Sequence, residues 1–139
     1  MMKTTEQELL GLIKKARFVF VCGNGGSAAN AEHFTNDLFS KGVSAICLNS
    51  NVSIITMIAN DYGYQYIYGN QLKRYGTKED LLITISCSGY SPNIVYAQEI
   101  ARGMGMPIYP FETFEPGKKD YGKLEDKHSK LIHKIKELL

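Results

Sequence analysis

The stretch that decides the fold is FVFVCGNGGSAAN, residues 18–30. It opens with five consecutive apolar residues, Phe18 to Cys22, and unbroken apolarity is typical of a central parallel strand that is covered on both faces. A run of glycines and Ser27 follow directly, and the residues from Ser27 to Ser40 have the pattern of a helix. A strand that leads through a glycine turn into a helix indicates an α/β fold.

The alternation of strands and helices continues to the end of the chain. Further strands are predicted at residues 43–48, 81–85 and 106–111, the last weakened by two prolines. Helices are predicted at residues 5–16, 27–40, 54–59, 64–75, 92–104 and 123–139. Thr5 and Glu8 have the spacing of a capping box for the first of these helices. We therefore expect a mostly parallel sheet flanked by helices, a Rossmann-like three-layer sandwich that binds ligands beyond the carboxyl ends of its strands.

The size and composition of the chain predict one globular domain, residues 1–139, in which 44% of the residues are hydrophobic and 22% are charged. A formal net charge of +2 is too small to indicate nucleic acid or an acidic membrane surface as a partner. No apolar run approaches the roughly 18 residues that cross a bilayer, and the polar start of the chain predicts no secretion signal. The widely spaced Cys22, Cys47 and Cys87 are interpreted as buried, reduced thiols of a cytoplasmic protein.

Two loops that follow predicted strands have the composition of anion sites. In the first loop, Gly25 and Gly26 allow backbone N–H groups to approach a ligand, and Ser27 is expected to cap the next helix. The second loop, residues 86–93, supplies three serines and ends in Ser91 and Pro92, expected at the N-cap and at the first helical position. Neither loop contains lysine or arginine, so hydroxyls and amides would hold the anion, which suits a sugar phosphate better than a triphosphate.

Two other interpretations of these loops stay open. Glycine- and serine-rich turns are common as plain connectors and caps. Gly23, Gly25 and Ala28 also satisfy G-x-G-x-x-A, which is typical of dinucleotide-binding Rossmann units. The dinucleotide interpretation requires an acidic residue at the end of the second strand, where this chain has Leu48-Asn49-Ser50. The dinucleotide interpretation also assigns no function to the serine-rich loop at residues 86–93.

Three segments together resemble the phosphoheptose isomerase family, whose members carry a sugar-isomerase (SIS) domain. They are GNGGSAA at residues 23–29, NDYGY at 60–64 and SCSGYSPN at 86–93, and they occur in the family's order. The resemblance covers roughly residues 18–106, with a weaker match at 124–139. It implies a single SIS domain and an isomerase that converts sedoheptulose 7-phosphate into an aldoheptose 7-phosphate in the cytoplasm, for the heptose of surface polysaccharides.

The resemblance also implies which residues bind the substrate. The family's loop asparagine, near the sugar hydroxyls, falls on Asn24, and its phosphate-binding serines fall on the serines of the two loops. The full set that it assigns to the substrate is Asn24, Gly25, Gly26, Ser27, Asn60, Asp61, Ser86, Ser88, Ser91 and Glu125.

The implied catalytic and metal residues lie on two predicted helices. The resemblance places the base on His133 and its carboxylate partner on Asp37, which suits moving a proton between adjacent carbons through an enediol. In several members the positions of His33, Asp37, Glu125 and His133 hold zinc, and two imidazoles with two carboxylates are a sensible zinc set. His33 and Asp37 share one helix face and are expected to project into a cleft or solvent. His128 falls in an apolar stripe and is interpreted as a core or interface histidine.

The chain departs from the family's pattern at several places. Asp37 stands where the family has Glu, Glu125 where it has Gln, and Cys87 where Thr is usual. The first helix and the segment 111–123 are shorter than in the family. The family's homo-oligomers, expected here as a tetramer, build their active sites between subunits, so His133 is expected to point away from its own core toward a neighbour. The alternative is a non-catalytic SIS module that binds a sugar phosphate or a protein partner.

Overall fold

The protein is built on a four-stranded sheet in which all neighbouring strands are parallel, as shown by a computed structural model that describes residues 2–139. The strands are β1 (Val19–Gly23), β2 (Ala45–Cys47), β3 (Leu81–Ile85) and β4 (Ile108–Pro110), in the order β2-β1-β3-β4. In the pairing of β1 with β3, Gly23 lies opposite Ile85. The two loops singled out in the sequence therefore start side by side, at the carboxyl ends of the two inner strands.

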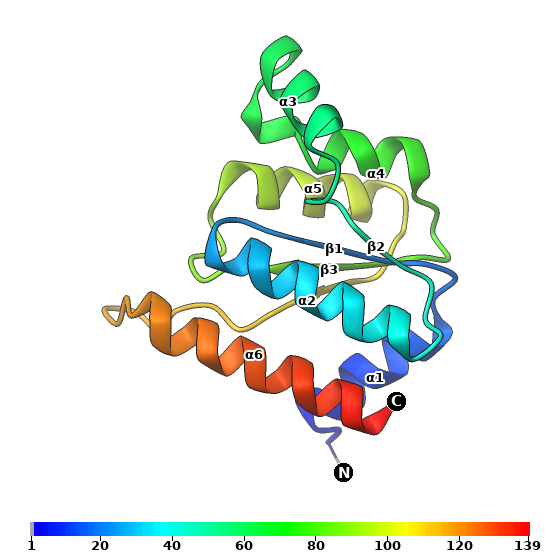
Figure 1. The fold of residues 1–139 in the computed structure, drawn as a ribbon, viewed down its shortest axis with the longest axis vertical. Coiled ribbons are helices and arrows are strands. Elements are labelled where there is room, and N and C mark those ends of the chain that lie inside the picture. Colours follow the sequence, from blue (N-terminus) through cyan, green and yellow to red (C-terminus); the bar gives the residue numbers. More distant parts are fainter. Residues whose placement is uncertain (1) are drawn as a thin grey trace.

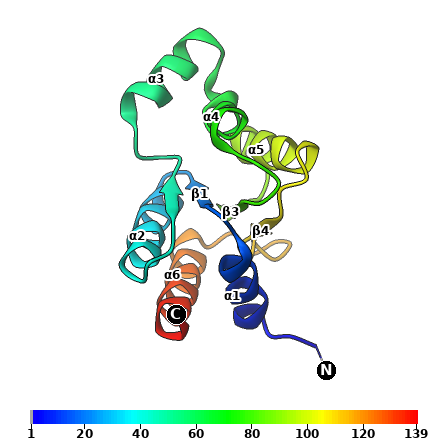
Figure 2. The same cartoon turned by 90° about the vertical axis from the view of Figure 1, so that its right-hand side faces the viewer.

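Helices cover both faces of the sheet, so the predicted α/β sandwich is confirmed (Figure 1, Figure 2). One face carries α1 (Thr5–Lys15), α2 (Gly26–Ser40) and α6 (Tyr121–Leu138). The other face carries α3 (Val52–Asp61), the short 3₁₀ helix η1 (Tyr64–Tyr66), α4 (Gly69–Tyr75) and α5 (Pro92–Gly103). In Figure 1, α2 and α6 lie side by side and run in the same direction.

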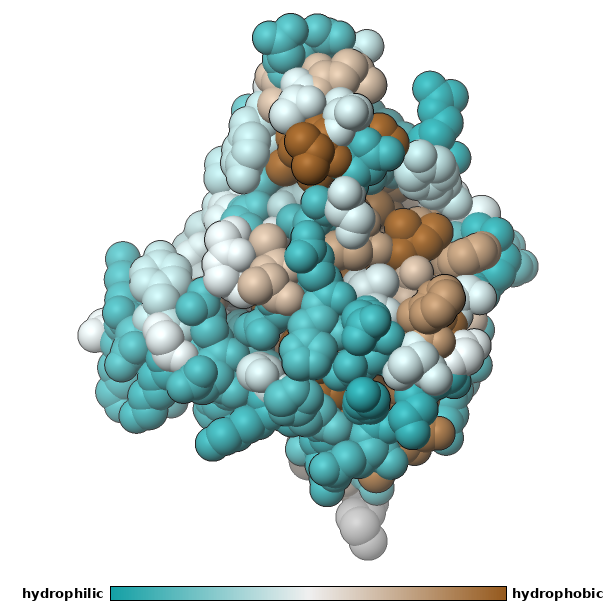
Figure 3. Space-filling model, viewed as in Figure 1, coloured by the Kyte–Doolittle hydropathy of each residue, from teal (hydrophilic) through white to brown (hydrophobic). Residues whose placement is uncertain are grey.

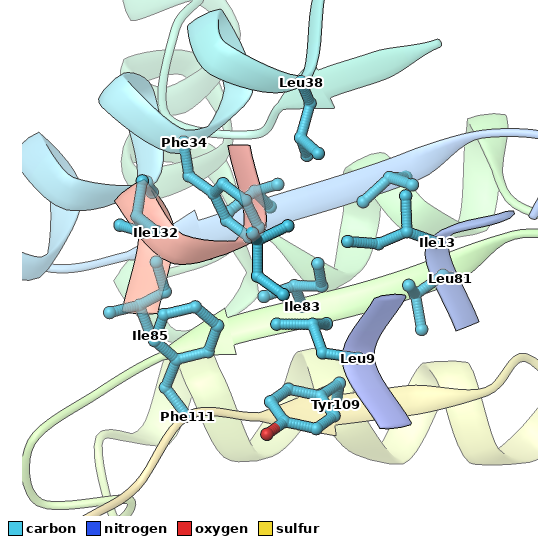
Figure 4. Packing of buried hydrophobic residues seen from close by; sticks show 14 of the residues in the cluster. Leu9, Ile13, Phe34, Leu38, Leu81, Ile83, Ile85, Tyr109, Phe111 and Ile132 are labelled. Carbon is cyan, nitrogen blue, oxygen red and sulfur yellow. The ribbon is translucent and has the colours of Figure 1, made fainter. Parts of the chain in front are cut away.

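The sheet divides the core into two layers because successive strand residues point to opposite faces. From β1, Val19 and Val21 join the layer under α1, α2 and α6, whereas Phe20 and Cys22 join the layer under α4 and α5. Figure 4 shows the first layer, where side chains of α1, α2 and α6 meet those of β3. Every residue of β1 and β3 is buried, which explains why both strands lack charged residues and why Thr84 is the one polar side chain in β3, where its hydroxyl accepts from Gln98 Nε2 at 3.0 Å.

Several predicted boundaries are wrong by one or a few residues. The capping box of α1 uses Thr4 and Gln7 rather than Thr5 and Glu8, because the Thr4 hydroxyl accepts from the Gln7 N–H and the Gln7 side chain accepts from the Thr4 N–H. The predicted helix 64–75 is divided into η1 and α4. The strands predicted at 43–48 and 106–111 are shorter, with three residues each, as befits the two edges of the sheet.

The predicted burial of the three cysteines is confirmed: Cys22, Cys47 and Cys87 are buried free thiols. His128 is also buried, and its Nε2 lies 2.6 Å from the carbonyl oxygen of Glu112. Burial lowers the pKa of His128, so the neutral imidazole donates this hydrogen bond. Across residues 2–139, none of the helices combines the length and apolarity that a bilayer crossing requires.

Candidate active site

A small pocket of about 280 Å³ opens where the loops after β1 and β3 meet. Larger hollows of about 590 and 600 Å³ lie elsewhere, but their linings contain no serine. The residues that line the small pocket are Asn24, Gly25, Gly26, Ser27, Ser86, Cys87, Ser88, Ser91, Tyr121 and Glu125. The structure therefore brings together all four serines of the two loops.

The first loop needs glycine at two positions for different reasons. Gly25 has a φ of +58°, a left-handed conformation that other residues adopt reluctantly. At Gly23, a Cβ atom would lie 2.6 Å from the Ser27 carbonyl oxygen and 2.7 Å from that of Ile85, so only glycine allows β1, β3 and α2 to approach so closely. The expectation that Ser27 caps α2 is wrong: Gly25 is the N-cap, and Ser27 lies buried in the first turn, where it lines the pocket.

In the second loop the serine hydroxyls stabilise the turn as acceptors. The Ser86 hydroxyl accepts from the Gly89 N–H at 3.0 Å, and the Ser88 hydroxyl accepts from the Tyr90 N–H at 3.2 Å. A hydroxyl has one proton of its own, so both serines can still donate to a bound anion. Ser91 is the N-cap of α5 and Pro92 its first residue, as predicted, but the Ser91 side chain makes no capping bond. Its hydroxyl is therefore available to the pocket as well.

Beneath the first loop lies a polar network that the sequence analysis missed. The Asn49 side chain bonds both backbone groups of Gly23: its Oδ1 accepts from the Gly23 N–H at 3.1 Å, and its Nδ2 donates to the Gly23 carbonyl oxygen. The β1–β2 pairing ends at Cys47, so this carboxamide continues the ladder in place of a further strand residue. Nδ2 of Asn49 also donates to the hydroxyl of Tyr68.

The same network holds Asn24 between the two loops. Oδ1 of Asn24 accepts from Asn93 Nδ2 at 3.0 Å and lies 2.9 Å from the Tyr68 hydroxyl, while its Nδ2 donates to Asn93 Oδ1 at 2.8 Å. Asn93 and Tyr68 are buried. The observed contacts of Asn24 thus tie the β1 loop to the start of α5. An asparagine two residues after the end of β2, Asn49, and another in the first turn of α5, Asn93, were the signals in the sequence.

A second group of polar side chains lies further along the seam between α2 and α6. One ligand atom from each of His33, Asp37 and His133 lies within 4.8 Å of the others. The ring centroids of His33 and His133 are 5.1 Å apart in an edge-to-face arrangement, and His33 Nε2 lies 3.3 Å from Asp37 Oδ2. Both imidazoles are exposed. His133 therefore faces a histidine of its own chain.

The expectation that Asp37 projects into a cleft or solvent is wrong. Its side chain is only 3% exposed, because α6 packs against this part of α2 and brings Lys136 to 3.4 Å from Asp37 Oδ1. The other oxygen, Oδ2, is buried without a hydrogen-bond partner. A buried carboxylate oxygen without a partner, beside two imidazoles, is the donor set that a zinc ion accepts. The three side chains present therefore fit a divalent metal.

Glu125 lies apart from this cluster, so the expected four-residue metal set is not assembled in full. Its carboxylate rests against Gly26 in the serine-lined pocket, where a Cβ on Gly26 would collide with it. Asn30 Nδ2 donates to the Glu125 carbonyl oxygen at 3.1 Å, which joins α2 to α6 at this end of the seam. Burial raises the pKa of the Cys87 thiol in the same pocket, and Glu125 raises it further, so this thiol is neutral.

Asn60 and Asp61 are not brought to the pocket. They are exposed at the end of α3, where Asn60 Nδ2 donates to Asp61 Oδ1 at 3.1 Å, and they are not among the residues that line the pocket. In Figure 1, α3 lies at the far end of the molecule from α6. Within one chain, the candidate site therefore consists of the serine-lined pocket and the histidine–aspartate cluster.

Comparison with known proteins shows which proteins this chain is similar to. The phosphoheptose isomerase of Helicobacter pylori (strain P12) is 39% identical over 131 residues, which are 90% of this chain and 66% of that protein. Solved phosphoheptose isomerases from Neisseria gonorrhoeae and Francisella tularensis match 96% of this chain, with TM-scores of 0.87 and 0.88 and identities of 27% and 26%. The matches cover 81% and 83% of those two chains.

The curated relatives are longer than this chain. The chain spans 66% of the length of the first relative and 56% of the length of a second Helicobacter pylori protein with the same name. The sequence model described as the SIS domain matches residues 3–111, which include both loops of the pocket and two of the three residues of the histidine–aspartate cluster, His33 and Asp37. Because that match extends over most of the chain, this protein belongs to the SIS domain family.

Proposed function

We propose that the protein is an aldose–ketose isomerase for a heptose phosphate, interconverting sedoheptulose 7-phosphate and D-glycero-D-manno-heptose 7-phosphate through an enediol. The observation that carries the proposal is that α2 bears both halves of the site. Ser27 in its first turn lines the hydroxyl-rich pocket, and His33 and Asp37 further along belong to the cluster with His133. The relatives named phosphoheptose isomerase support the same substrate class.

The separation of the two halves suits a long sugar phosphate. Ser27 and His33 lie about 9 Å apart along the axis of α2, at a rise of about 1.5 Å per residue. An extended chain of single bonds advances roughly 1.2 Å per bond, so the carbon chain and phosphate ester of a heptose 7-phosphate span about 10 Å. A triose phosphate is too short to place its phosphate among the serines and its carbonyl beside His33.

The pocket supports phosphate binding by neutral donors. Ser86 and Ser88 keep a donor free, and the N-terminus of α2 presents the positive end of the helix dipole. None of the residues that line the pocket is lysine or arginine. The phosphate would anchor the sugar so that its carbonyl end reaches the cluster in a fixed orientation.

In the proposed mechanism His133 is the base. It removes a proton from C1 of the ketose, this proton exchanges with solvent, and the imidazole delivers a proton to C2, while the C1 hydroxyl loses its proton and the C2 carbonyl oxygen gains one. Asp37 is its partner for the protons on oxygen. Because Asp37 is buried, it would act through His33 Nε2, which lies 3.3 Å from its carboxylate and borders the ring of His133.

The proposal includes zinc as a cofactor, held by His33, Asp37 and His133 with Glu125 as the expected fourth ligand. The chemistry of the donor set and the buried Oδ2 of Asp37, which accepts no hydrogen bond, support it. A bound zinc would supply a Lewis acid for the oxygens of the enediol. For Glu125 to join, its carboxylate must turn away from Gly26 along the seam.

The proposal also includes a cytoplasmic homo-oligomer, a tetramer, that supplies heptose for surface polysaccharide. Apolar and aromatic side chains on and after α3 support an interface: Val52, Met57, Tyr62 and Tyr64 are between 49% and 70% exposed. In Figure 3, hydrophobic side chains reach the surface around α3, near the top of the view. Asn60 and Asp61 lie on the same helix and would reach a serine-lined pocket from a neighbouring subunit.

The test is conversion of sedoheptulose 7-phosphate, with the aldose product separated by anion-exchange chromatography. We expect the wild type to convert the ketose, and His133→Ala to abolish conversion while leaving the affinity for inorganic phosphate unchanged. An exposed lysine on α6, replaced in Lys130→Ala, is the matched control. Thermal stabilisation by the sugar phosphate without conversion would instead establish the non-catalytic binding module.

A further inference from the structure

One charged side chain at the histidine–aspartate cluster has no part in the proposed chemistry. Lys136 follows His133 by one turn of α6, and its ammonium lies 3.4 Å from Asp37 Oδ1. The Lys136 side chain is 44% exposed, whereas that of Asp37 is 3% exposed. The carboxylate therefore has an ammonium at one oxygen and the His33 imidazole at the other.

This arrangement gives Asp37 its counter-charge. A buried carboxylate is costly unless a positive charge or several hydrogen bonds compensate it. Among the described residues, Asp37 forms ion pairs with His33 and Lys136 only. Of these two partners, Lys136 brings an ammonium group, whose positive charge lies directly beside the Asp37 carboxylate.

The same carboxylate is the one anionic member of the three-residue group that can hold a metal. Metal–ligand bonds to imidazole and carboxylate are about 2.1 Å long, so a cation held by His33, Asp37 and His133 would lie within about 7 Å of the Lys136 ammonium. The two positive charges would repel each other and would share a single carboxylate. Lysine has a long flexible stem, and this one is half exposed, so its ammonium can turn into solvent.

We propose that Lys136 is a built-in counter-ion that competes with a divalent metal for Asp37 and thereby sets the metal affinity of the cluster. In the metal-free protein Lys136 stabilises the fold by neutralising Asp37. When metal binds, this ion pair weakens, so metal binding is coupled to release of the lysine. The inference rests on the metal-binding part of the proposed function and adds a residue that tunes it.

The experiment compares Lys136→Met with Lys134→Met, whose lysine lies on the same helix but pairs with the exposed Glu137 at 3.8 Å. Protein treated with a chelator is titrated with Zn²⁺ alone by calorimetry, and its thermal unfolding is followed without and with Zn²⁺. We expect Lys136→Met to bind Zn²⁺ about fivefold more tightly or better than the wild type. Its metal-free form should unfold at a lower temperature, and saturating Zn²⁺ should remove that deficit. Lys134→Met and Lys136→Arg should behave like the wild type.

Equal Zn²⁺ affinity of Lys136→Met and the wild type would overturn the inference, as would equal stability of their metal-free forms. If no variant takes up Zn²⁺, both this inference and the zinc proposal are wrong. Isomerase activity is measured separately on the same samples, so its loss or presence decides the proposed reaction independently of Lys136. A variant that fails to fold is recognised by circular dichroism, and Lys136→Arg then carries the comparison, because retained charge must retain both affinity and stability.

Discussion

Replacing Asn49 by alanine tests the polar network that supports the pocket. The Asn49 side chain forms hydrogen bonds with both the N–H and the carbonyl oxygen of Gly23. Its loss leaves the Gly23 N–H buried without a partner, whereas the Gly23 carbonyl oxygen still accepts from the Tyr68 hydroxyl. An orphaned buried donor and one lost hydrogen bond together cost about 2–4 kcal/mol. Tyr68→Phe removes the hydroxyl, but both of its acceptors retain another donor. Asn49 Nδ2 still donates to the Gly23 carbonyl oxygen, and Asn93 Nδ2 still donates to Asn24 Oδ1. Its cost is therefore only about 1 kcal/mol.

Thermal and urea unfolding measure this difference. At roughly 3 °C per kcal/mol for a domain of this size, Asn49→Ala should lower Tm by about 6–12 °C and Tyr68→Phe by about 3 °C. Asn36→Ala, at an exposed position of α2, is the control and should change Tm by no more than 1–2 °C, roughly the effect of an ordinary surface substitution. Asn49→Ala should also weaken binding of inorganic phosphate, because the loop it supports lines the pocket. If Asn49→Ala were no more destabilising than Tyr68→Phe, the Gly23 N–H would have another partner in the variant, and its dependence on Asn49 would be wrong.

Two further predictions follow from charged groups. Burial alone would raise the pKa of Asp80, but the Arg17 guanidinium and hydrogen bonds from Thr77 and Phe18 lower it. The ionised Asp80 carboxylate therefore stabilises the folded protein above about pH 4, and this stabilisation is lost as the pH falls below that value. The difference in unfolding free energy between wild type and Asp80→Asn, measured in urea, should therefore shrink between pH 5 and pH 3, and a constant difference would contradict this assignment. Glu125 is the charged residue of the pocket lining, so Glu125→Gln should raise the affinity for inorganic phosphate about fivefold, measured by calorimetry. If Glu125→Gln showed no gain over the control Asp126→Asn, the Glu125 carboxylate would move out of the pocket at no cost when phosphate binds.

The sequence predicts the fold well where burial repeats locally. The strand at 81–85 has the predicted bounds because β3 is covered on both faces, so a run that is apolar except for Thr84 specifies it. The predicted bounds of the edge strands β2 and β4 were less accurate, since each of these strands pairs with a neighbour on one side only. The cap of α1 was misplaced by one residue because Thr4 and Thr5 offer the same hydroxyl and the hydrogen bonds alone decide between them.

The site is predictable only in part from the sequence, for a physical reason. The serines of the two loops converge because β1 and β3 are neighbouring parallel strands whose carboxyl ends lie side by side. The alternation of strands and helices in the sequence is enough to predict this arrangement. The burial of Asp37 depends instead on Lys136 and α6, which are distant in sequence, and on the angle at which two helices pack. The contacts of Asn49 with Gly23 and Tyr68 have the same character, because each residue alone is an unremarkable loop or helix residue.

Incubation of the protein with sedoheptulose 7-phosphate in D₂O, followed by proton NMR, detects proton transfer at the proposed site. The phosphate of the sugar is expected among the serines at the start of α2, and its carbonyl beside His33 and His133. With the wild type, deuterium should therefore enter at the carbon next to the carbonyl, whereas His133→Ala should leave this carbon fully protonated. A wild type that binds the sugar phosphate but incorporates no deuterium, with or without added Zn²⁺, would show that these histidines transfer no proton on the bound sugar.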